Sequence, residues 1–149
     1  MREIKFRVFL RDKMYYPDEY KEYEDNLEGI DFKNKTVSFS EYADGEVGVF
    51  IQEYSFDKES LLYEEDLKIM QYTGLKDKKE REIYEGDILL QRYTDEYSIV
   101  YYEDGKFLTK NKNEEIRLDL NCLNRLTEVV GNIYENEIVT TNQLIKREV

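Results

Sequence analysis

Residues 70–90 read MQYTGLKDKKEREIYEGDILL. The stretch alternates short apolar runs with glycines and acidic side chains, and it ends in three consecutive aliphatic residues, 88–90. Gly86 can adopt a positive φ, and Asp87 can accept hydrogen bonds from turn amides just before that aliphatic run. The pattern therefore predicts a strand, a turn and the start of a second strand, and we interpret these residues as structural.

The carboxylates of the same stretch allow a chemical alternative. Glu82, Glu85 and Asp87 could gather around Mg²⁺ or form an acid/base pair in a cleft. In an extended segment, however, alternation places Glu82 and Glu85 on opposite faces, so the three side chains would not all converge. We therefore expect no catalytic residue, no metal ligand and no cofactor, and keep a carboxylate-based, metal-dependent enzyme as a lesser alternative.

Short apolar runs separated by turn residues continue along the rest of the chain. The pairs Asp44-Gly45 and Asp104-Gly105 are typical of tight hairpin turns. Helical spacing of apolar residues predicts a short helix or turn at 57–70 and a short terminal helix at 137–147. Strands are predicted at 2–10, 35–39, 47–51, 87–93, 97–102, 106–109, 115–120 and 128–134, the last with a bulge or kink at Gly131.

Many short strands joined by glycine turns favour a mainly β fold with barrel-like (SH3-like or related) antiparallel sheets. At 149 residues the chain fits one domain, 1–149, or two β subdomains that divide near 66–75.

Composition excludes several classes of chemistry. The chain has no histidine, which removes Ser/His/Asp and Cys/His catalysis and His-ligated zinc sites. Its single cysteine, Cys122, lies among apolar residues and is interpreted as a buried thiol in a reducing cytoplasm. No apolar run approaches the roughly 20 residues of a membrane span. We therefore expect a cytoplasmic protein.

The negative charge is concentrated in one part of the chain. Residues 12–66 hold 17 acidic and 5 basic side chains, which equals the whole net charge of -12. Such a charge opposes non-specific attraction to nucleic acid and to anionic membranes, so we expect neither as a direct partner.

The densest part of this region, residues 15–32 (YYPDEYKEYEDNLEGIDF), alternates tyrosines with carboxylates. One interpretation is a solvated connection whose rings lie on a neighbouring surface. The other is an acidic, aromatic surface that receives a basic partner or imitates nucleic acid. The candidate partner surface comprises Tyr15, Tyr16, Glu19, Tyr20, Glu22, Tyr23, Glu24 and Asp25.

Three ordered motifs carry a resemblance to a known family. Residues 70–77 with 82–88, the start MREIKFR and the segment EVVGNIYEN at 128–136 resemble the YopX family of phage and prophage proteins. Where that family commonly has an Asn-Gly turn, this chain has Lys79-Glu80, which predicts a loop without the easy positive-φ turn. The matching motif residues are Tyr72, Thr73, Gly74, Asp77, Tyr84, Glu85, Gly86, Asp87, Gly131, Asn132 and Tyr134.

The resemblance implies a mostly β protein encoded by a phage and acting in the bacterial cytoplasm, with no settled activity. Our functional hypothesis is a non-enzymatic phage accessory protein that acts by protein binding. It would form a homo-oligomer and bind a host or phage protein. The alternative from another class is an acidic DNA mimic that inhibits a host nucleic-acid-binding or defence protein.

Overall fold

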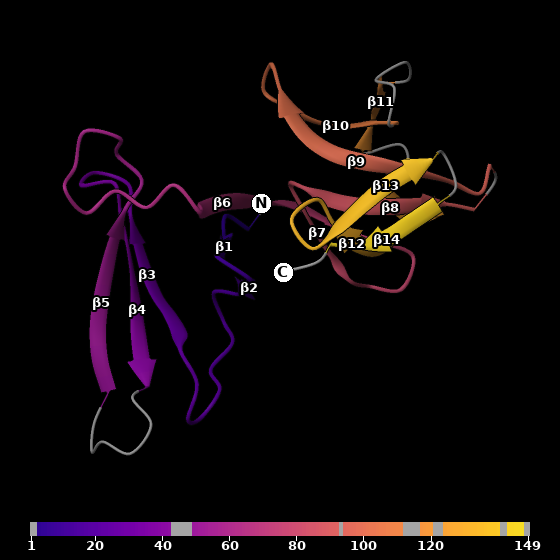
Figure 1. The fold of residues 1–149 in the computed structure, drawn as a ribbon. Helices are drawn as coiled ribbons and strands as arrows, with labels where there is room; N and C mark the ends of the chain where they lie inside the picture. The colour runs from indigo at the N-terminus through magenta and orange to yellow at the C-terminus, as the bar shows by residue number, and fades with distance from the viewer. Residues whose placement is uncertain are drawn as a thin grey trace. The chain divides into compact units, whose positions relative to one another are not determined.

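The computed structural model describes residues 3–42, 49–92, 94–111, 117–120, 124–140 and 143–147. The chain divides into two compact units (Figure 1). Unit 2 is Phe6–Ile69, and unit 1 combines Met1–Lys5 with Met70–Val149. Unit 2 is therefore an insertion between two parts of unit 1. The sheets of both units are antiparallel, which confirms the predicted mainly β fold.

Unit 2 contains a hairpin and a three-stranded sheet. The hairpin pairs β1 with β2, and β1 is followed in sheet order by β6 (Leu67–Lys76). The separate sheet has the order β3-β4-β5. The strands are β1 (Phe6–Leu10), β2 (Lys13–Tyr15), β3 (Asn26–Asp31), β4 (Thr36–Tyr42) and β5 (Val49–Ser55).

The core of unit 2 forms where the alternating apolar residues of these strands meet. Its fully buried members are Val8, Leu10, Val37, Phe39 and Leu67. Alternation along β4 directs the second and fourth of its residues, Val37 and Phe39, into this core.

Unit 1 contains a five-stranded half-barrel with the order β11-β10-β9-β8-β12, the β6-β7 pair and a separate β13-β14 hairpin. Its core is formed by Ile83, Leu89, Val100, Phe107 and Leu120. The elements are β6 (Leu67–Lys76), β7 (Glu82–Tyr84), β8 (Asp87–Gln91), β9 (Glu96–Glu103), β10 (Lys106–Lys110), β11 (Arg117–Asp119), the 3-10 helix η1 (Asn124–Leu126), β12 (Thr127–Asn132), β13 (Asn136–Thr140) and β14 (Gln143–Lys146).

Two predicted backbone features of unit 1 are present. Asp104 and Gly105 have φ values of 51° and 80° and connect Glu103 to its partner Lys106, as a two-residue hairpin turn requires. The register of β12 against β8 shifts between Val129 and Gly131, where a bulge was predicted.

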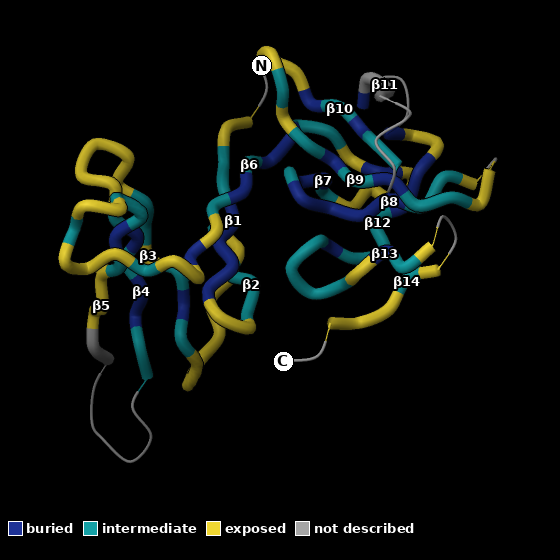
Figure 2. Tube along the Cα trace, turned by 45° about the horizontal axis from the view of Figure 1, so that its top comes forward, coloured by how far each residue is buried: buried dark blue, intermediate teal, exposed yellow. Residues whose placement is uncertain are grey.

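The helix predicted at 137–147 is wrong, and of the helix or turn predicted at 57–70 the structure has turns followed by a strand. Residues 57–66 form a series of turns that leads into β6, and Figure 2 shows this connection between β5 and β6 to be largely exposed. Of the four residues with helical spacing, only Leu67 and Met70 are buried. Residues 137–147 belong to the β13-β14 hairpin, in which Ile138 is opposite Leu144. A cross-strand pair brings these two apolar side chains together, as one face of a helix would have done.

Some predictions fall outside the described residues. They are the Asp44-Gly45 turn, the setting of Cys122 and the first part of the predicted strand at 115–120. Among the described residues, no helix is long and apolar enough to cross a membrane.

Candidate functional site

Asp77 organises the loop between β6 and β7. Its side chain is completely buried. One carboxylate oxygen accepts hydrogen bonds from the amides of Lys79 (2.8 Å) and Arg81 (2.9 Å), and the other accepts one from the amide of Val129 (2.8 Å). A carboxylate with three amide donors fixes the loop against β12 and uses its acceptors for structure.

Tyr72, Thr73 and Tyr84 join β6 to β7. The Thr73 hydroxyl donates to the carbonyl of Ile83 at 2.7 Å. The rings of Tyr72 and Tyr84 have centroids 5.3 Å apart, and both residues are buried. Gly74 lies within the segment of β6 where the register with β7 shifts. These motif residues therefore build the strand pair.

The Glu85-Gly86 turn connects β7 to β8. Gly86 has a φ of 86°, its amide donates to the carbonyl of Val100, and an added Cβ would lie 3.3 Å from the sulfur of Met70. Asp87 accepts a hydrogen bond from the amide of Tyr84 at 2.8 Å and is buried. Glu85 accepts a longer one, 3.4 Å, from the amide of Gln71.

The C-terminal motif closes the turn between β12 and β13. The Asn132 carboxamide oxygen accepts hydrogen bonds from the amides of Tyr134 (3.1 Å) and Glu135 (3.0 Å). Gly131 leaves room for the Asn136 side chain, which a Cβ at Gly131 would overlap. The amide of Ile133 also donates to the carbonyl of Gly86 at 2.9 Å, so the motif ties this turn to the turn that precedes β8.

The prediction about Lys79-Glu80 is wrong. Glu80 adopts a φ of 64°, so the loop keeps the left-handed residue that an Asn-Gly turn would supply. Its amide donates to the carbonyl of Asp77 at 3.0 Å, and its carboxylate pairs with Arg125 at 2.7 Å. The hydrogen bonds of Asp77 outweigh the unfavourable conformation of a non-glycine residue.

The carboxylates considered as metal ligands have separate partners. Glu82 pairs with Lys5, Glu85 with the amide of Gln71, and Asp87 with the amide of Tyr84. Within the part of the chain that the structure describes, no group of three or more acidic or cysteine side chains has the geometry of a metal site.

A cluster of cations around Glu128 was not predicted from the sequence. The Glu128 carboxylate is contacted by Lys79 (2.7 Å), Arg81 (3.2 Å) and Arg92 (2.5 Å). These hydrogen bonds and charges, Lys79 first, lower the pKa of Glu128 from 4.5 to about 2. We call Lys79, Arg81, Arg92 and the neighbouring Arg125 the cation cluster. Three positive charges contact the single negative charge of Glu128, which leaves an excess of positive charge. Each of the three cationic side chains is about half exposed, so this excess reaches solvent.

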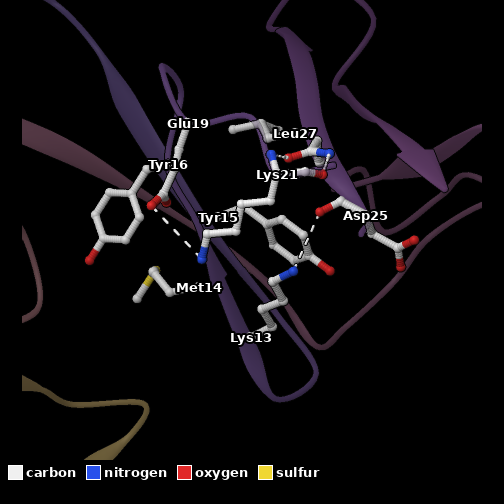
Figure 3. A pocket seen from close by; sticks show the side chains of 9 residues that line it. Lys13, Met14, Tyr15, Tyr16, Glu19, Lys21, Asp25 and Leu27 are labelled. Atoms are coloured by element: carbon white, nitrogen blue, oxygen red, sulfur yellow. Dashed lines mark hydrogen bonds and ion pairs between the residues drawn. The ribbon is translucent and has the colours of Figure 1, made fainter. Parts of the chain in front are cut away.

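The acidic, tyrosine-rich segment of unit 2 is an ordered connection between β2 and β3. Buried Asn26 holds it: its side chain accepts from the amide of Lys21 (2.7 Å) and donates to the carbonyls of Lys21 (2.9 Å) and Glu24 (3.0 Å). The Lys13 ammonium donates to the carbonyl of Asp25 (Figure 3). Asn26 had no signal in the sequence beyond being a polar residue next to the strand.

The structure divides the candidate partner surface into inward and outward members. Tyr15 packs edge-on against Phe39, and its burial, followed by nearby Asp25, raises its pKa to about 12. Asp25 accepts a hydrogen bond from the amide of Tyr42 at 2.8 Å. By contrast, Tyr20 is 74% exposed.

The remaining members also reach solvent to different degrees. Tyr23 is 69% exposed although its ring contacts Tyr42. Tyr16 is less exposed and lies beneath the guanidinium of Arg7. Glu19, Glu22 and Glu24 are exposed. We call Glu19, Tyr20, Glu22, Tyr23 and Glu24 the acidic tyrosine surface.

Cavities are present in both units of the described chain. The one beneath the acidic segment has a volume of about 10 Å³, room for a single water molecule (Figure 3). A second, of about 150 Å³, lies in unit 1 against β8, β9 and β10. Its lining includes the buried hydroxyl of Ser98, which has no hydrogen-bond partner within the described residues, and one carboxylate, Glu96. A lone carboxylate does not provide an acid/base pair.

Comparisons with known proteins agree with the motifs. The model of the family described as YopX protein matches residues 5–138. No curated protein matches. The chain is similar to the crystal structure of protein EF1440 from Enterococcus faecalis, with 25% sequence identity and a TM-score of 0.52 over 91% of this chain and 96% of that chain. Because the family model spans most of the sequence, the chain belongs to the YopX family.

Proposed function

We propose that this protein is a non-enzymatic phage accessory protein that acts in the bacterial cytoplasm by binding another protein, as a homo-oligomer. The supporting observation is that buried polar groups such as Asp77 and Asn26 hold the fold together, while Tyr20 and Tyr23 keep most of their surface in solvent. Tyr20 and Tyr23 are held outward by a connection that Asn26 fixes. Exposed tyrosines on an ordered support are typical of residues that anchor protein interfaces.

The charge around these tyrosines indicates the chemistry of the partner. Glu19, Glu22 and Glu24 surround them, and unit 2 as a whole is strongly acidic. A basic protein surface would gain both ring burial and charge complementarity here. The partner we propose is a host or phage protein with a basic binding face.

The test is affinity capture from infected or lysogenic cells with the wild-type chain and with Tyr20→Ser/Tyr23→Ser. We expect a protein that binds the wild type and is lost with the double variant. Ile4→Ser, at another exposed apolar residue, is the matched control and should capture as the wild type does. Native mass measurement of the purified chain tests the oligomer. A monomer that captures nothing specific would contradict both parts.

The acidic DNA mimic is a second candidate, supported by the exposure of three carboxylates within six residues, Glu19 to Glu24. Reversing Glu19, Glu22 and Glu24 to lysine should abolish inhibition of a DNA-binding host protein while the tyrosines remain. Asp25 is left unchanged because it accepts a backbone hydrogen bond. Competition with duplex DNA separates the candidates, since only a mimic must occupy the DNA site.

A further inference from the structure

The connection between β5 and β6, residues 57–66, exposes apolar side chains although its backbone is held by many hydrogen bonds. We call it the Leu61 loop. The Leu61 side chain is fully exposed, and Leu62 is 53% exposed. The apolar surface of this tip stays in water in the folded chain. Covering it with another molecule would therefore be energetically favourable.

The backbone bonds of the Leu61 loop show that the exposure is built in. The amide of Ser55 donates to the carbonyl of Leu62 (2.9 Å), and the amide of Glu64 donates to the carbonyl of Ser55 (2.9 Å). At the tip, the Ser60 hydroxyl accepts from the amide of Leu62 (3.1 Å), and Asp57 accepts from the amide of Glu59 (3.1 Å). A loop ordered before binding loses little conformational freedom on binding, which favours affinity.

Acidic residues surround the tip. The loop contains five carboxylates and one lysine, and Glu59, Glu65 and Asp66 are exposed. Glu64 instead pairs with Arg11 within unit 2. The occupant of this surface should therefore present apolar area together with positive charge.

This chain carries a surface of that kind in unit 1. The cation cluster places three half-exposed cations on the single carboxylate of Glu128. Arg125, which pairs with Glu80, adjoins them, so four cations stand against two carboxylates, and the neighbouring Leu126 is 41% exposed. The apolar and charged elements of the Leu61 loop thus both have counterparts here.

We infer that the Leu61 loop of one copy docks on the cation cluster and Leu126 of a second copy. The inference rests on the proposed self-assembly and names its interface. Because the two surfaces differ, the contact is heterologous, with each copy able to give one and receive one. The acidic tyrosine surface plays no part in this contact and remains for another protein.

Leu61→Ser tests the apolar part. Self-association, followed by light scattering and native mass spectrometry over a range of concentrations, should weaken by at least about tenfold, as for an interface anchor. Ile4→Ser is the control and should associate as the wild type does. Raising the salt concentration should also weaken association, because exposed charges are screened.

Reciprocal charge reversal tests the charged part. Glu59→Lys/Glu65→Lys alters the loop, and Arg125→Glu alters the edge of the cation cluster without removing a contact of Glu128. Each variant alone should fail to associate, and an equimolar mixture should regain association because each then meets the opposite charge. Thermal unfolding and circular dichroism confirm that each variant is folded.

The outcomes are separable. A wild-type chain that stays monomeric at every concentration contradicts the inference and the proposed self-assembly together. A wild type that associates while Leu61→Ser and both reversals associate equally well contradicts the inference alone. Two monomeric reversals whose mixture also stays monomeric contradict it as well.

Discussion

The loop at Asp77 in unit 1 and the Leu61 loop in unit 2 are both connections between strands, yet their side chains are arranged in opposite ways. Asp77, a charged residue, is completely buried with three amide partners. Leu61, an apolar residue, is fully exposed on a hydrogen-bonded backbone. The buried charge of Asp77 is explained by its hydrogen bonds within the fold, whereas the exposed Leu61 side chain is the part that we propose a partner covers. Substitutions at the two loops should therefore differ in their effect on stability.

The largest effect is expected from Asp77→Ala. Three backbone amides would lose their acceptor in a buried place, which should lower the free energy of unfolding by more than about 3 kcal/mol. Urea denaturation measures it. Asp31→Ala is the matched control, since exposed Asp31 accepts from the amides of Lys33 and Asn34. The cost of Asp31→Ala should be much smaller, because water can replace an exposed carboxylate as the acceptor. Equal costs would contradict the role assigned to burial.

Gly86→Ala should cost about 2 kcal/mol, because its φ of 86° disfavours a Cβ and the added atom would press on Met70. Gly105 has a similar φ, 80°, with nothing within 4 Å of an added Cβ. Gly105→Ala should therefore show only the conformational part, about 1 kcal/mol. Thermal and urea unfolding of both variants separate backbone strain from contact.

Glu128 should make stability depend on acid. Its folded pKa of about 2 lies below the ordinary 4.5, so the unfolded chain binds the proton more readily between these values. Its stabilising contribution is therefore complete above about pH 4.5 and is lost as pH falls toward 2. In Glu128→Gln this part of the pH dependence should disappear, as denaturation at a series of pH values would show. If the free energy of unfolding of Glu128→Gln still fell with pH as in the wild type, the ion pairs of Glu128 would not be the cause of this pH dependence.

Glu80→Gly should raise stability by about 0.5–1 kcal/mol, because glycine adopts the φ of 64° without a Cβ penalty. The lost pair with Arg125 is exposed and offsets only part of the gain. Arg125→Ala alone measures that part. A destabilised Glu80→Gly would show that the ion pair outweighs the backbone conformation.

The smallest effect is expected from Leu61→Ser, within about 0.5 kcal/mol of the wild type, because the folded chain does not bury this side chain. The same substitution at Leu67, which is buried in unit 2, should cost more than about 2 kcal/mol. Denaturation of the monomer at low concentration keeps any self-association out of the measurement.

Part of the fold of unit 1 could be predicted from the sequence because its signals are local. The turn at Asp104-Gly105 and the bulge near Gly131 follow from chain chemistry over a few residues. The helix predicted at 137–147 is absent because short apolar patterns fit both a helix and a strand, and Ile138 meets Leu144 across a hairpin. At 57–66 the turn, not the helix, is present, and Leu61 is exposed to solvent. In so short a segment, the spacing of apolar residues does not decide between a helix and a strand, or which of these residues will be buried.

The candidate surfaces depended on contacts that are distant in sequence. Glu128 meets Lys79 and Arg92 across separations of several dozen residues, so no window of the sequence displays the cation cluster. The acidic tyrosine surface was visible as composition. The inward packing of Tyr15 and the support by Asn26 required the fold.

The insertion of unit 2 has a consequence for synthesis. Within unit 1, the carbonyl of Lys5 accepts a hydrogen bond from the amide of Tyr72 at 2.8 Å. The ribosome therefore makes one side of this bond at the start and must complete the whole of Phe6–Ile69 before the other side exists. All residues of unit 2 are synthesised before Met70–Val149 of unit 1. Unit 2 can therefore fold before the strand that pairs with the opening residues of the chain has been made.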